Sequence, residues 1–371
     1  MPSRSEPYRI AVFGPGDVGS VVIREAARLP EFQVVGALVF QEKKDNVDVG
    51  TLVGIQELGV KATRNLDKFL AIECDAVVHT ALDSPSINAL EDFRRLLEAG
   101  KNVVTCHPYS YLPARPAQFG KVIKAAALKG QATFYAGGLN PDFITQRLAV
   151  LLTGLSNDVQ RIKIEEYFDC EDQTNAGNLQ IIGLGGDPQK AMDENGSAVW
   201  YQKHFWFQMI QHISYELGVK IDRIEATSKC EPAPEDIVRP TMTIKKGQTG
   251  IVSYESTGYV GDKPFISILI GWYQSPIMKP AHVKSETEWI VTIEGRPSSR
   301  TVLDLKSSFF TDAKHVDGEP LPPGYHSFGV SLLQSVPMTV EAKPGFKAPD
   351  VPAVHWKKDQ RENVAVCYRE G

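Results

Sequence analysis

Apolar runs and helical patterns alternate along the first 145 residues of the chain. Short apolar, β-branched runs predict strands, and apolar positions at helical spacing predict helices of about 10–15 residues between them. The predicted strands are Tyr8–Phe13, Phe32–Phe40, Asp75–Leu82, Lys101–Cys106 and Ala132–Tyr135, and the predicted helices are Val18–Leu29, Pro85–Ala99 and Ala114–Leu128. This alternation is typical of βαβ units with a parallel sheet buried on both faces.

After residue 145 apolar and polar positions alternate instead, which predicts half-exposed strands. These segments are Arg161–Asp169, Pro240–Lys245, Gly250–Ser256, Phe265–Tyr273 and Trp289–Gly295, with a capped helix predicted at Ser197–Leu217 and a helical pattern at Leu321–Pro344. We therefore predict an α/β protein in which residues 1–145 and 325–371 form an N-terminal Rossmann domain with a doubly wound parallel sheet. Residues 146–324 are expected to form an α+β substrate and oligomerisation domain with a mixed or antiparallel sheet.

The composition narrows the function classes. The chain has 371 residues and 40 Lys and Arg against 45 Asp and Glu, a net charge of −5 that argues against nucleic-acid binding. Its cysteines are odd in number and never form a C-x-x-C pair, so no disulfide framework or metal site is expected: Cys74, Cys106, Cys170, Cys230 and Cys367. With no apolar leader and no membrane span in the sequence, we expect a cytoplasmic protein without a membrane partner.

A glycine-rich turn follows the first predicted strand and opens the first predicted helix. Its residues fit the pattern G-x-G-x-x-G: Gly14, Pro15, Gly16, Asp17, Val18 and Gly19. The first glycine permits the tight turn, the second lets the backbone approach a pyrophosphate, and the third allows close packing of helix on strand. The alternative is a βα turn without a ligand, but this context favours dinucleotide binding.

The end of the second strand bears on the choice between NAD and NADP. An acidic residue there binds the ribose hydroxyl of NAD, whereas a basic residue accommodates the phosphate of NADP. The chain reads Phe40-Gln41-Glu42-Lys43-Lys44, with two lysines after a late acid. We predict NADP, with NAD possible, and contacts from Phe40, Gln41 and Lys43. The lysines can also be solvated loop charges.

Several motifs together resemble a known family. FGPGDVGSVVIREAARLPEFQVVGALVF, GVKAT, DAVVHTAL, AGKNVVTC, GGLNPDF and SLLQSVPMTVEAKPGF are similar to the dihydrodipicolinate-reductase-like group, and within it to the 2,4-diaminopentanoate dehydrogenases and related NAD(P)-dependent amine dehydrogenases. The resemblance implies an Asn-Pro beside the nicotinamide, matched by Asn140 and Pro141, with Asp142 where a glycine is usual. It also implies cofactor contacts at the ends of the third and fourth strands, from Thr80, Ala81, Leu82, Cys106 and His107.

The chain departs from the family in two places. The His-His-x-x-x-Lys element and the Ser-Gly-Thr loop of dihydrodipicolinate reductases are missing, which argues against that reaction. Amine dehydrogenases have an acidic residue after the segment KNVVTC, whereas here Cys106-His107-Pro108-Tyr109-Ser110-Tyr111-Leu112-Pro113 has no carboxylate.

Other residues are therefore candidates for proton transfer. His107 follows a parallel strand, where α/β sheets place their ligands, and Tyr109 is a hydroxyl alternative. Glu165 is a candidate acid on a strand whose sheet faces the cofactor in the resembling family, and alternation places Glu165, Tyr167 and Asp169 on one face. An acidic solvated loop is the alternative. His204, on an aromatic helix, is expected to line an apolar substrate pocket rather than bind metal.

We therefore expect a homodimeric NAD(P)H-dependent oxidoreductase. It would transfer hydride between nicotinamide and a C=O or C=N group of a small, apolar ketone, aldehyde or amine. Three alternatives remain at this point: an amine dehydrogenase proper that uses a carboxylate from residues 165–172, an enzyme of the same fold that reduces an enone or oxidises an alcohol, and a catalytically silent NADP-binding sensor.

Overall fold

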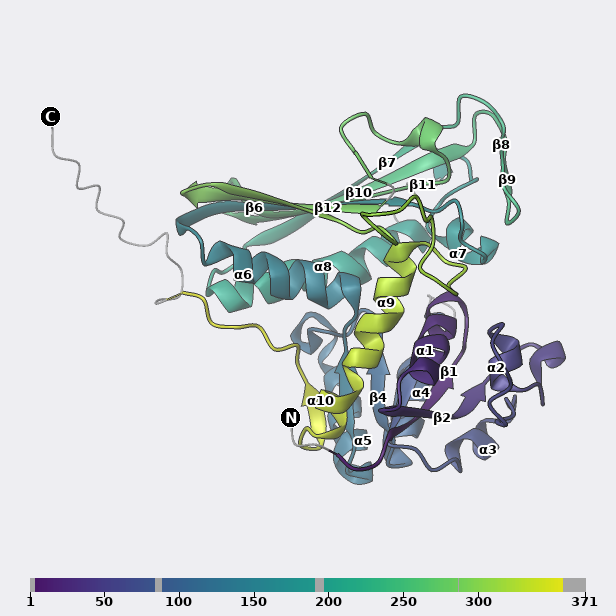
Figure 1. Cartoon of the computed structure of the whole chain (residues 1–371). Coiled ribbons are helices and arrows are strands. Elements are labelled where there is room, and N and C mark those ends of the chain that lie inside the picture. Colours follow the sequence, from purple (N-terminus) through teal and green to yellow (C-terminus); the bar gives the residue numbers. More distant parts are fainter. Residues whose placement is uncertain (1–3, 84–88, 191–196, 286, 356–371) are drawn as a thin grey trace, which may run out of the picture. The chain divides into compact units, whose positions relative to one another are not determined.

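The computed structural model describes residues 4–83, 89–190, 197–285 and 287–355, and the chain divides into two compact units (Figure 1). The first unit contains Met1–Phe143, Asp172–Asn175 and Lys306–Pro349. The second contains Ile144–Glu171, Ala176–Leu305 and the chain from Asp350. The domain boundaries at residues 145 and 325 stay a prediction, and residues 356–371 lie outside the described part.

The first unit is built on a parallel sheet of six strands in the order β14-β5-β4-β3-β1-β2. Its strands are β1 (Tyr8–Phe13), β2 (Phe32–Leu38), β3 (Ala76–His79), β4 (Asn102–Thr105), β5 (Thr133–Ala136) and β14 (Gly345–Lys347). Its helices are α1 (Asp17–Arg28), α2 (Val49–Leu52), α3 (Leu66–Leu70), α4 (Ala89–Glu98), α5 (Ala117–Gly130), α9 (Pro323–Gln334) and α10 (Val336–Val340), with 3₁₀ turns η1 (Glu42–Lys44) and η2 (Leu112–Ala114). The predicted Rossmann-type sheet is confirmed.

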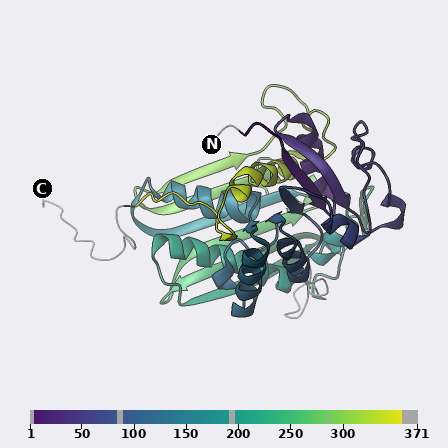
Figure 2. The ribbon, with the colours of Figure 1, turned by 90° about the horizontal axis from the view of Figure 1, so that it is seen from below.

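Both faces of this sheet are covered by helices, which explains the continuous apolar runs of its strands. Along β1, Ile10 and Val12 pack with residues of α1, α9 and α10, whereas Ala11 and Phe13 pack with residues of α4 and α5. Figures 1 and 2 show α9 beside α1, where a Cβ on Gly329 would come within 2.6 Å of the Val21 side chain. The chain reverses its winding between β2 and β3, which lie on opposite sides of β1. In such sheets ligands bind at the carboxyl ends of the strands near this reversal.

The second unit has a mixed sheet in the order β13-β12-β6-β11-β10-β7, in which β6 and β11 are parallel and the other neighbours antiparallel. Its strands are β6 (Asn157–Asp169), β7 (Arg223–Pro232), β10 (Thr249–Val260), β11 (Lys263–Tyr273), β12 (Thr287–Arg296) and β13 (Ser299–Asp304), with a separate ribbon of β8 (Ile237–Val238) and β9 (Thr243–Ile244). Its helices are α6 (Ala149–Thr153), α7 (Ala176–Ile181) and α8 (Ser197–Leu217), with a 3₁₀ turn η5 (Pro276–Met278). The predicted mixed sheet is confirmed.

Two details of the second sheet differ from the sequence prediction. The edge strands β7 and β13 were not predicted because their sequences are largely polar. The strand predicted at Pro240–Lys245 is wrong as a member of the main sheet, since only Thr243–Ile244 is extended and it pairs with β8. By contrast, α8 has its predicted bounds and packs on the sheet through Trp206, whose ring stacks on Tyr254 with centroids 5.1 Å apart.

The described residues contain neither a membrane-spanning helix nor a preformed metal cluster. No helix in this part of the chain is long and apolar enough to cross a bilayer. Among the same residues, no three His, Cys, Asp or Glu side chains are gathered as metal ligands would be.

Candidate functional site

The three glycines of the turn between β1 and α1 have different surroundings. Gly14 has a φ of +76°, which disfavours other residues, and a Cβ there would lie 2.6 Å from the Ala81 Cβ. A Cβ on Gly19 would lie 2.4 Å from the Thr80 hydroxyl oxygen. Around Gly16, in contrast, a Cβ would meet no atom of the described protein within 4 Å. Packing therefore requires the first and third glycines, whereas the second borders open space.

That open space lies at the N-terminus of α1. Gly16 is the N-cap residue and makes no side-chain cap, so the N–H groups of the first turn are available to an anion. The Thr80 hydroxyl donates to the Gly14 carbonyl at 2.9 Å and holds the turn against the end of β3. The Asp17 carboxylate accepts a hydrogen bond from Thr174, in the segment Asp172–Asn175 of the same unit. These residues fit a dinucleotide pyrophosphate.

Two large apolar side chains are exposed at the carboxyl ends of β2 and β3. Phe40 is 59% exposed and Leu82 is 43% exposed. Exposed apolar residues beside an anion-binding turn fit the adenine ring of a dinucleotide. Of the other residues predicted here, Gln41 directly precedes η1 without capping it, Lys43 is exposed on η1, and Ala81 is buried below the turn.

The segment after β5 holds the predicted Asn-Pro. Asn140 and Pro141 lie in the irregular segment Leu139–Leu148, directly before Asp142. Asp142 is fully buried with a φ of +100°, a conformation that favours glycine and explains why a glycine is usual there in the resembling family. The Tyr135 hydroxyl donates to the Asp142 carboxylate, which compensates for burying that group. The aspartate thus anchors the Asn-Pro segment to β5.

His107 lies just after β4 inside an aromatic cluster. It is 6% exposed, and its ring centroid is 5.3 Å from that of His79 and 6.2 Å from that of Phe93. Burial, followed by the neighbouring His79, lowers the pKa of His107 to about 3. In the described residues its Nε2 has no hydrogen-bond partner. His107 is therefore a neutral imidazole at physiological pH.

This burial predicts a loss of stability in mild acid. An unfolded chain takes up a proton on His107 near pH 6.5 and the folded protein does not, so stability falls as the pH drops below that value. Between pH 6.5 and pH 5 we expect His107 to account for about 2 kcal/mol. Thermal unfolding of the wild type and His107→Asn, compared across this pH range, measures the difference. Parallel pH dependences of the two proteins would contradict the assignment.

A carboxylate that the sequence analysis missed lies beside Tyr109. The Tyr109 hydroxyl donates to Asp83 Oδ2 at 2.5 Å, and both side chains are buried. Burial raises the pKa of Asp83, against the lowering effect of the Tyr109 hydrogen bond, and burial raises the pKa of Tyr109 well above its usual value. The Arg115 guanidinium lies over the Tyr109 ring, 4.7 Å from its centroid. Because Asp83 comes just after β3 and Tyr109 just after β4, the adjacency of parallel strands is the signal that could have paired them.

In the second unit, the predicted catalytic Glu165 belongs to a polar cluster on one face of the sheet. Its carboxylate accepts from Lys163 Nζ at 2.9 Å and from the Tyr167 hydroxyl at 3.2 Å. Tyr167 also lies 2.9 Å from His282 Nε2, and burial with Glu165 raises the pKa of Tyr167. The structure thus brings together Glu165 and Tyr167, as alternation along β6 predicted.

The other carboxylates of this stretch are engaged separately. Glu166, on the opposite face of β6, accepts from the indole N–H groups of Trp272 at 2.7 Å and Trp289 at 2.8 Å. Asp169 Oδ1 accepts from the Glu171 backbone N–H at 2.9 Å. Glu165, Glu166 and Asp169 therefore have different hydrogen-bond partners.

His204 has a hydrogen-bond partner within its own helix. Its Nδ1 lies 2.8 Å from the Trp200 carbonyl oxygen, and its ring stacks on the Trp200 indole with centroids 4.2 Å apart. This arrangement places an imidazole and an indole side by side on α8. Its predicted role in substrate binding stays a prediction.

Comparisons with known proteins agree with the fold and the glycine turn. Residues 8–106 match the family model described as dihydrodipicolinate reductase, N-terminus. This confirms the resemblance predicted from the motifs. The class defined by the fold and these comparisons is that of NAD(P)-dependent oxidoreductases, which use a nicotinamide cofactor.

Within that class, the chain is similar to amine dehydrogenases along almost its whole length. It is 27% identical to an amine dehydrogenase of Streptomyces virginiae over 355 residues, which cover 92% of this chain and 95% of the relative. An amine dehydrogenase structure from Mycobacterium smegmatis aligns with a TM-score of 0.74 at 19% identity, covering 95% and 98% of the two chains. The structure of GenD2 from gentamicin A biosynthesis, in complex with NAD, aligns with a TM-score of 0.51 at 17% identity, covering 92% and 89%.

Proposed function

We propose that the protein is an NADPH-dependent oxidoreductase that carries out the reversible reductive amination of a small, apolar ketone or aldehyde. The observation that carries the cofactor assignment is the turn from Gly14 to Gly19. Packing requires Gly14 and Gly19, whereas Gly16 leaves open space at the start of α1. The amine substrate rests on the similarity to an amine dehydrogenase over 92% of the chain. Lys43 is our first candidate for the phosphate that distinguishes NADP from NAD.

The nicotinamide cofactor supplies the hydride, and the chain's own residues must handle the protons. Forming an imine from a ketone and ammonia expels water, and hydride addition to the imine carbon needs a proton for the nitrogen. The loop after β4 lacks the carboxylate that amine dehydrogenases have there, but Asp83 reaches this loop through Tyr109. We propose that the Asp83–Tyr109 pair holds the proton, with Asn140 and Pro141 beside the nicotinamide.

His107 and Glu165 have different supporting roles in this proposal. A neutral His107 can donate one hydrogen bond and accept another but carries no excess proton at physiological pH. We propose that it positions Tyr109, whose ring lies edge-on to the imidazole with centroids 6.5 Å apart. Glu165 remains the alternative residue for proton transfer that the sequence predicted, and its carboxylate accepts hydrogen bonds from Lys163 and Tyr167.

The cellular location and the oligomeric state are part of the same proposal. We propose a cytoplasmic homodimer. The cytoplasm is supported by the thiols of Cys74, Cys106, Cys170 and Cys230, which are free. The homodimer is the oligomeric state expected from the sequence, and size-exclusion chromatography with light scattering tests it directly.

Turnover assays test the reaction. Purified protein, NADPH and a panel of apolar ketones are incubated with and without ammonia, and products are identified by mass spectrometry. We expect amine formation that requires ammonia. Asp83→Asn, which retains the size and polarity of the side chain, should lower kcat by about 100- to 10,000-fold while NADPH affinity stays unchanged; a wild-type kcat in this variant would remove Asp83 from the mechanism.

Other outcomes separate the alternatives. Alcohol formation without ammonia would show a carbonyl reductase. Tight NADPH binding without turnover of any substrate would favour the silent sensor. The neutral, buried His107 is the observation that best agrees with this alternative.

A further inference from the structure

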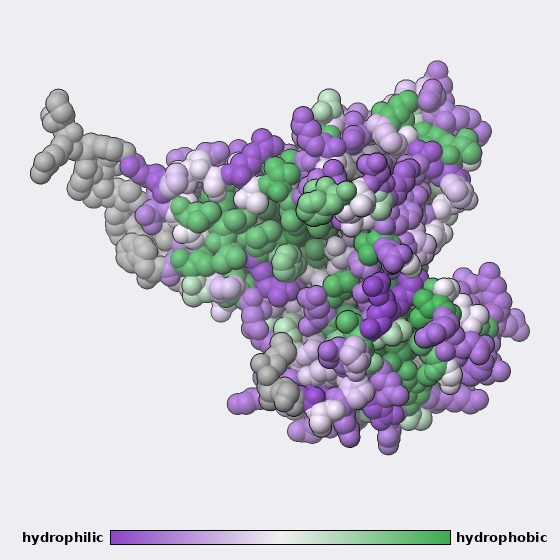
Figure 3. Space-filling model, in the orientation of Figure 1, coloured by the Kyte–Doolittle hydropathy of each residue, from purple (hydrophilic) through white to green (hydrophobic). Residues whose placement is uncertain are grey.

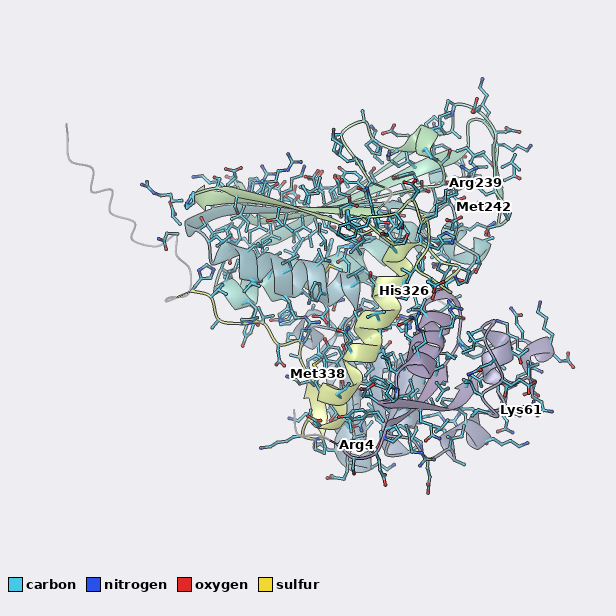
Figure 4. All side chains as sticks on the ribbon, in the orientation of Figure 1. Arg4, Lys61, Arg239, Met242, His326 and Met338 are labelled. Atoms are coloured by element: carbon cyan, nitrogen blue, oxygen red, sulfur yellow. The ribbon has the colours of Figure 1, made fainter. Side chains whose placement is uncertain are left out.

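The first unit has a basic pocket whose lining residues have not yet been given a role in cofactor binding or catalysis. It is open, has a volume of about 670 Å³, and is lined by Asp45, Asn46, Lys61, Ala62, Thr63, Arg64, Asn65 and Lys68. Three of these side chains are cationic and one is a carboxylate. Figure 4 labels Lys61 at the edge of the first unit, and Figure 3 shows that the surface there is hydrophilic.

The pocket is tied to the end of β2 by backbone hydrogen bonds. Thr63 pairs with Leu38, the last residue of β2, as an isolated parallel bridge. The Val39 N–H donates to the Thr63 carbonyl at 2.9 Å, and the Thr63 N–H donates to the Ala37 carbonyl at 2.9 Å. In dinucleotide-binding sheets the adenosine ribose lies at the carboxyl end of the second strand. The pocket therefore adjoins the place expected for the ribose 2′ position.

Arg64 is the residue that connects the pocket to this strand end. Its Nε donates to the Phe40 carbonyl at 3.1 Å, and its backbone N–H donates to Asp45 Oδ1 at 2.8 Å. Within the described part of the chain, the guanidinium makes no other hydrogen bond and no ion pair. Its two terminal amino groups are thus available to a ligand, while its orientation is fixed through Nε.

The remaining charges favour an anion. Lys61 and Lys68 are exposed, and neither forms an ion pair with another described residue. The Asp45 carboxylate also lines the pocket, but one of its oxygens is occupied by the Arg64 N–H. Lys43 and Lys44 lie on η1 and are absent from the described lining.

We infer that Arg64, supported by Lys61 and Lys68, binds the 2′-phosphate of NADP. A planar guanidinium with two free amino groups matches a phosphate better than a flexible lysine does. The inference rests on the proposed function, because it assumes that the turn after β1 binds a dinucleotide. The inference assigns the selectivity for NADP to Arg64 and not to Lys43, which lies on η1.

Two small probes isolate this subsite. 2′,5′-ADP and 5′-AMP differ by the 2′-phosphate, and neither requires turnover. Calorimetry with Arg64→Ala should show roughly 10- to 100-fold weaker binding of 2′,5′-ADP and of NADPH, the loss expected for hydrogen bonds to a charged group. Binding of 5′-AMP and NADH should change less than about 2-fold. Arg64→Lys should recover part of the lost affinity, because lysine restores the positive charge but not the paired N–H donors of the guanidinium.

Matched variants show whether the effect is local. Lys124→Ala, which removes an exposed charge from α5, should leave all four affinities unchanged. The inference is overturned if Arg64→Ala weakens 5′-AMP and 2′,5′-ADP equally, since Arg64 would then only hold the Phe40 segment. It is also overturned if Lys43→Ala with Lys44→Ala abolishes the preference and Arg64→Ala does not.

The wild type separates this inference from the proposed function. Binding of NADH without binding of NADPH or 2′,5′-ADP would reject the phosphate subsite alone. Failure to bind any of these nucleotides would reject the dinucleotide site and the subsite with it.

Discussion

Gly16→Asp is expected to weaken NADPH binding by about 1000-fold while the protein remains folded. A carboxylate about 4 Å from a pyrophosphate costs about 4 kcal/mol at the effective dielectric of a protein surface, which corresponds to this factor. The fold should tolerate the change because a Cβ on Gly16 meets no described protein atom within 4 Å. Gly16 also has a φ of −86°, outside the left-handed region that favours glycine.

Fluorescence titration measures the affinity for NADPH, and circular dichroism shows whether the variant is folded. Gly16→Asn is the matched control, because it has the size of aspartate without the charge and should lose much less affinity. Gly19→Asn should instead disturb the fold, since a Cβ there would lie 2.4 Å from Thr80 Oγ1. NADPH affinity within 10-fold of the wild type in Gly16→Asp would show that the pyrophosphate does not lie at this turn.

Glu319→Ala is expected to destabilise the first unit by about 3–5 kcal/mol, the usual cost of leaving one partner of a buried ion pair alone. Arg24 Nε donates to Glu319 Oε2 at 3.0 Å, and both side chains are less than a tenth exposed. Arg24 also donates to the Val53 carbonyl at 3.1 Å. His326, labelled in Figure 4, lies with Nδ1 3.5 Å from the same carboxylate. The pair thus joins α1 to the segment before α9.

This ion pair should also weaken in acid. Burial by itself raises the pKa of Glu319, but hydrogen bonds from His326 and Arg24 outweigh it and lower the pKa overall. A carboxyl group whose pKa is lower in the folded state stabilises the protein above its unfolded pKa. That contribution is lost as the pH falls through the folded pKa, so the difference between Glu319→Ala and the wild type should shrink in strong acid.

Hydrogen exchange of β1 and α1 amides is the appropriate readout for this variant. Tryptophan fluorescence is unsuitable, because the tryptophans of the described chain, Trp200, Trp206, Trp272 and Trp289, all lie in the second unit. Arg94→Ala, which breaks exposed ion pairs on α4, is the control and should cost less than about 1 kcal/mol. Replacing Arg24 and Glu319 together by methionine should restore most of the stability. A loss below 1 kcal/mol in Glu319→Ala would contradict the expected cost of burial.

Local patterns predicted the parts of the fold that depend on neighbours in sequence. The apolar runs predicted β1, β3 and β4 because a parallel sheet buries both faces of its strands. The bounds of α8 followed from its caps. The glycine turn was predictable because its three glycines lie within six consecutive residues. The family model that matches residues 8–106 includes this turn and agrees with a nicotinamide cofactor.

The candidate site was predicted less completely, because its contacts join distant residues. Asp83 and Tyr109 are 26 residues apart, Arg64 and the Phe40 carbonyl 24, and Arg24 and Glu319 295. No periodicity connects such pairs. The burial of His107 was missed for the same reason, since its pKa depends on His79 and on the packing of the sheet.

The sequence by itself determined the class of fold, the dinucleotide turn and the resemblance to amine dehydrogenases. These depend on short-range backbone geometry and on the burial of apolar runs, both of which are written in adjacent residues. Only the tertiary structure decided which charges are buried, which carboxylate reaches the loop after β4, and that the cations beside β2 come from residues 61–68. Electrostatic and hydrogen-bonding partners are chosen by proximity in space, and strand order rather than sequence order sets that proximity.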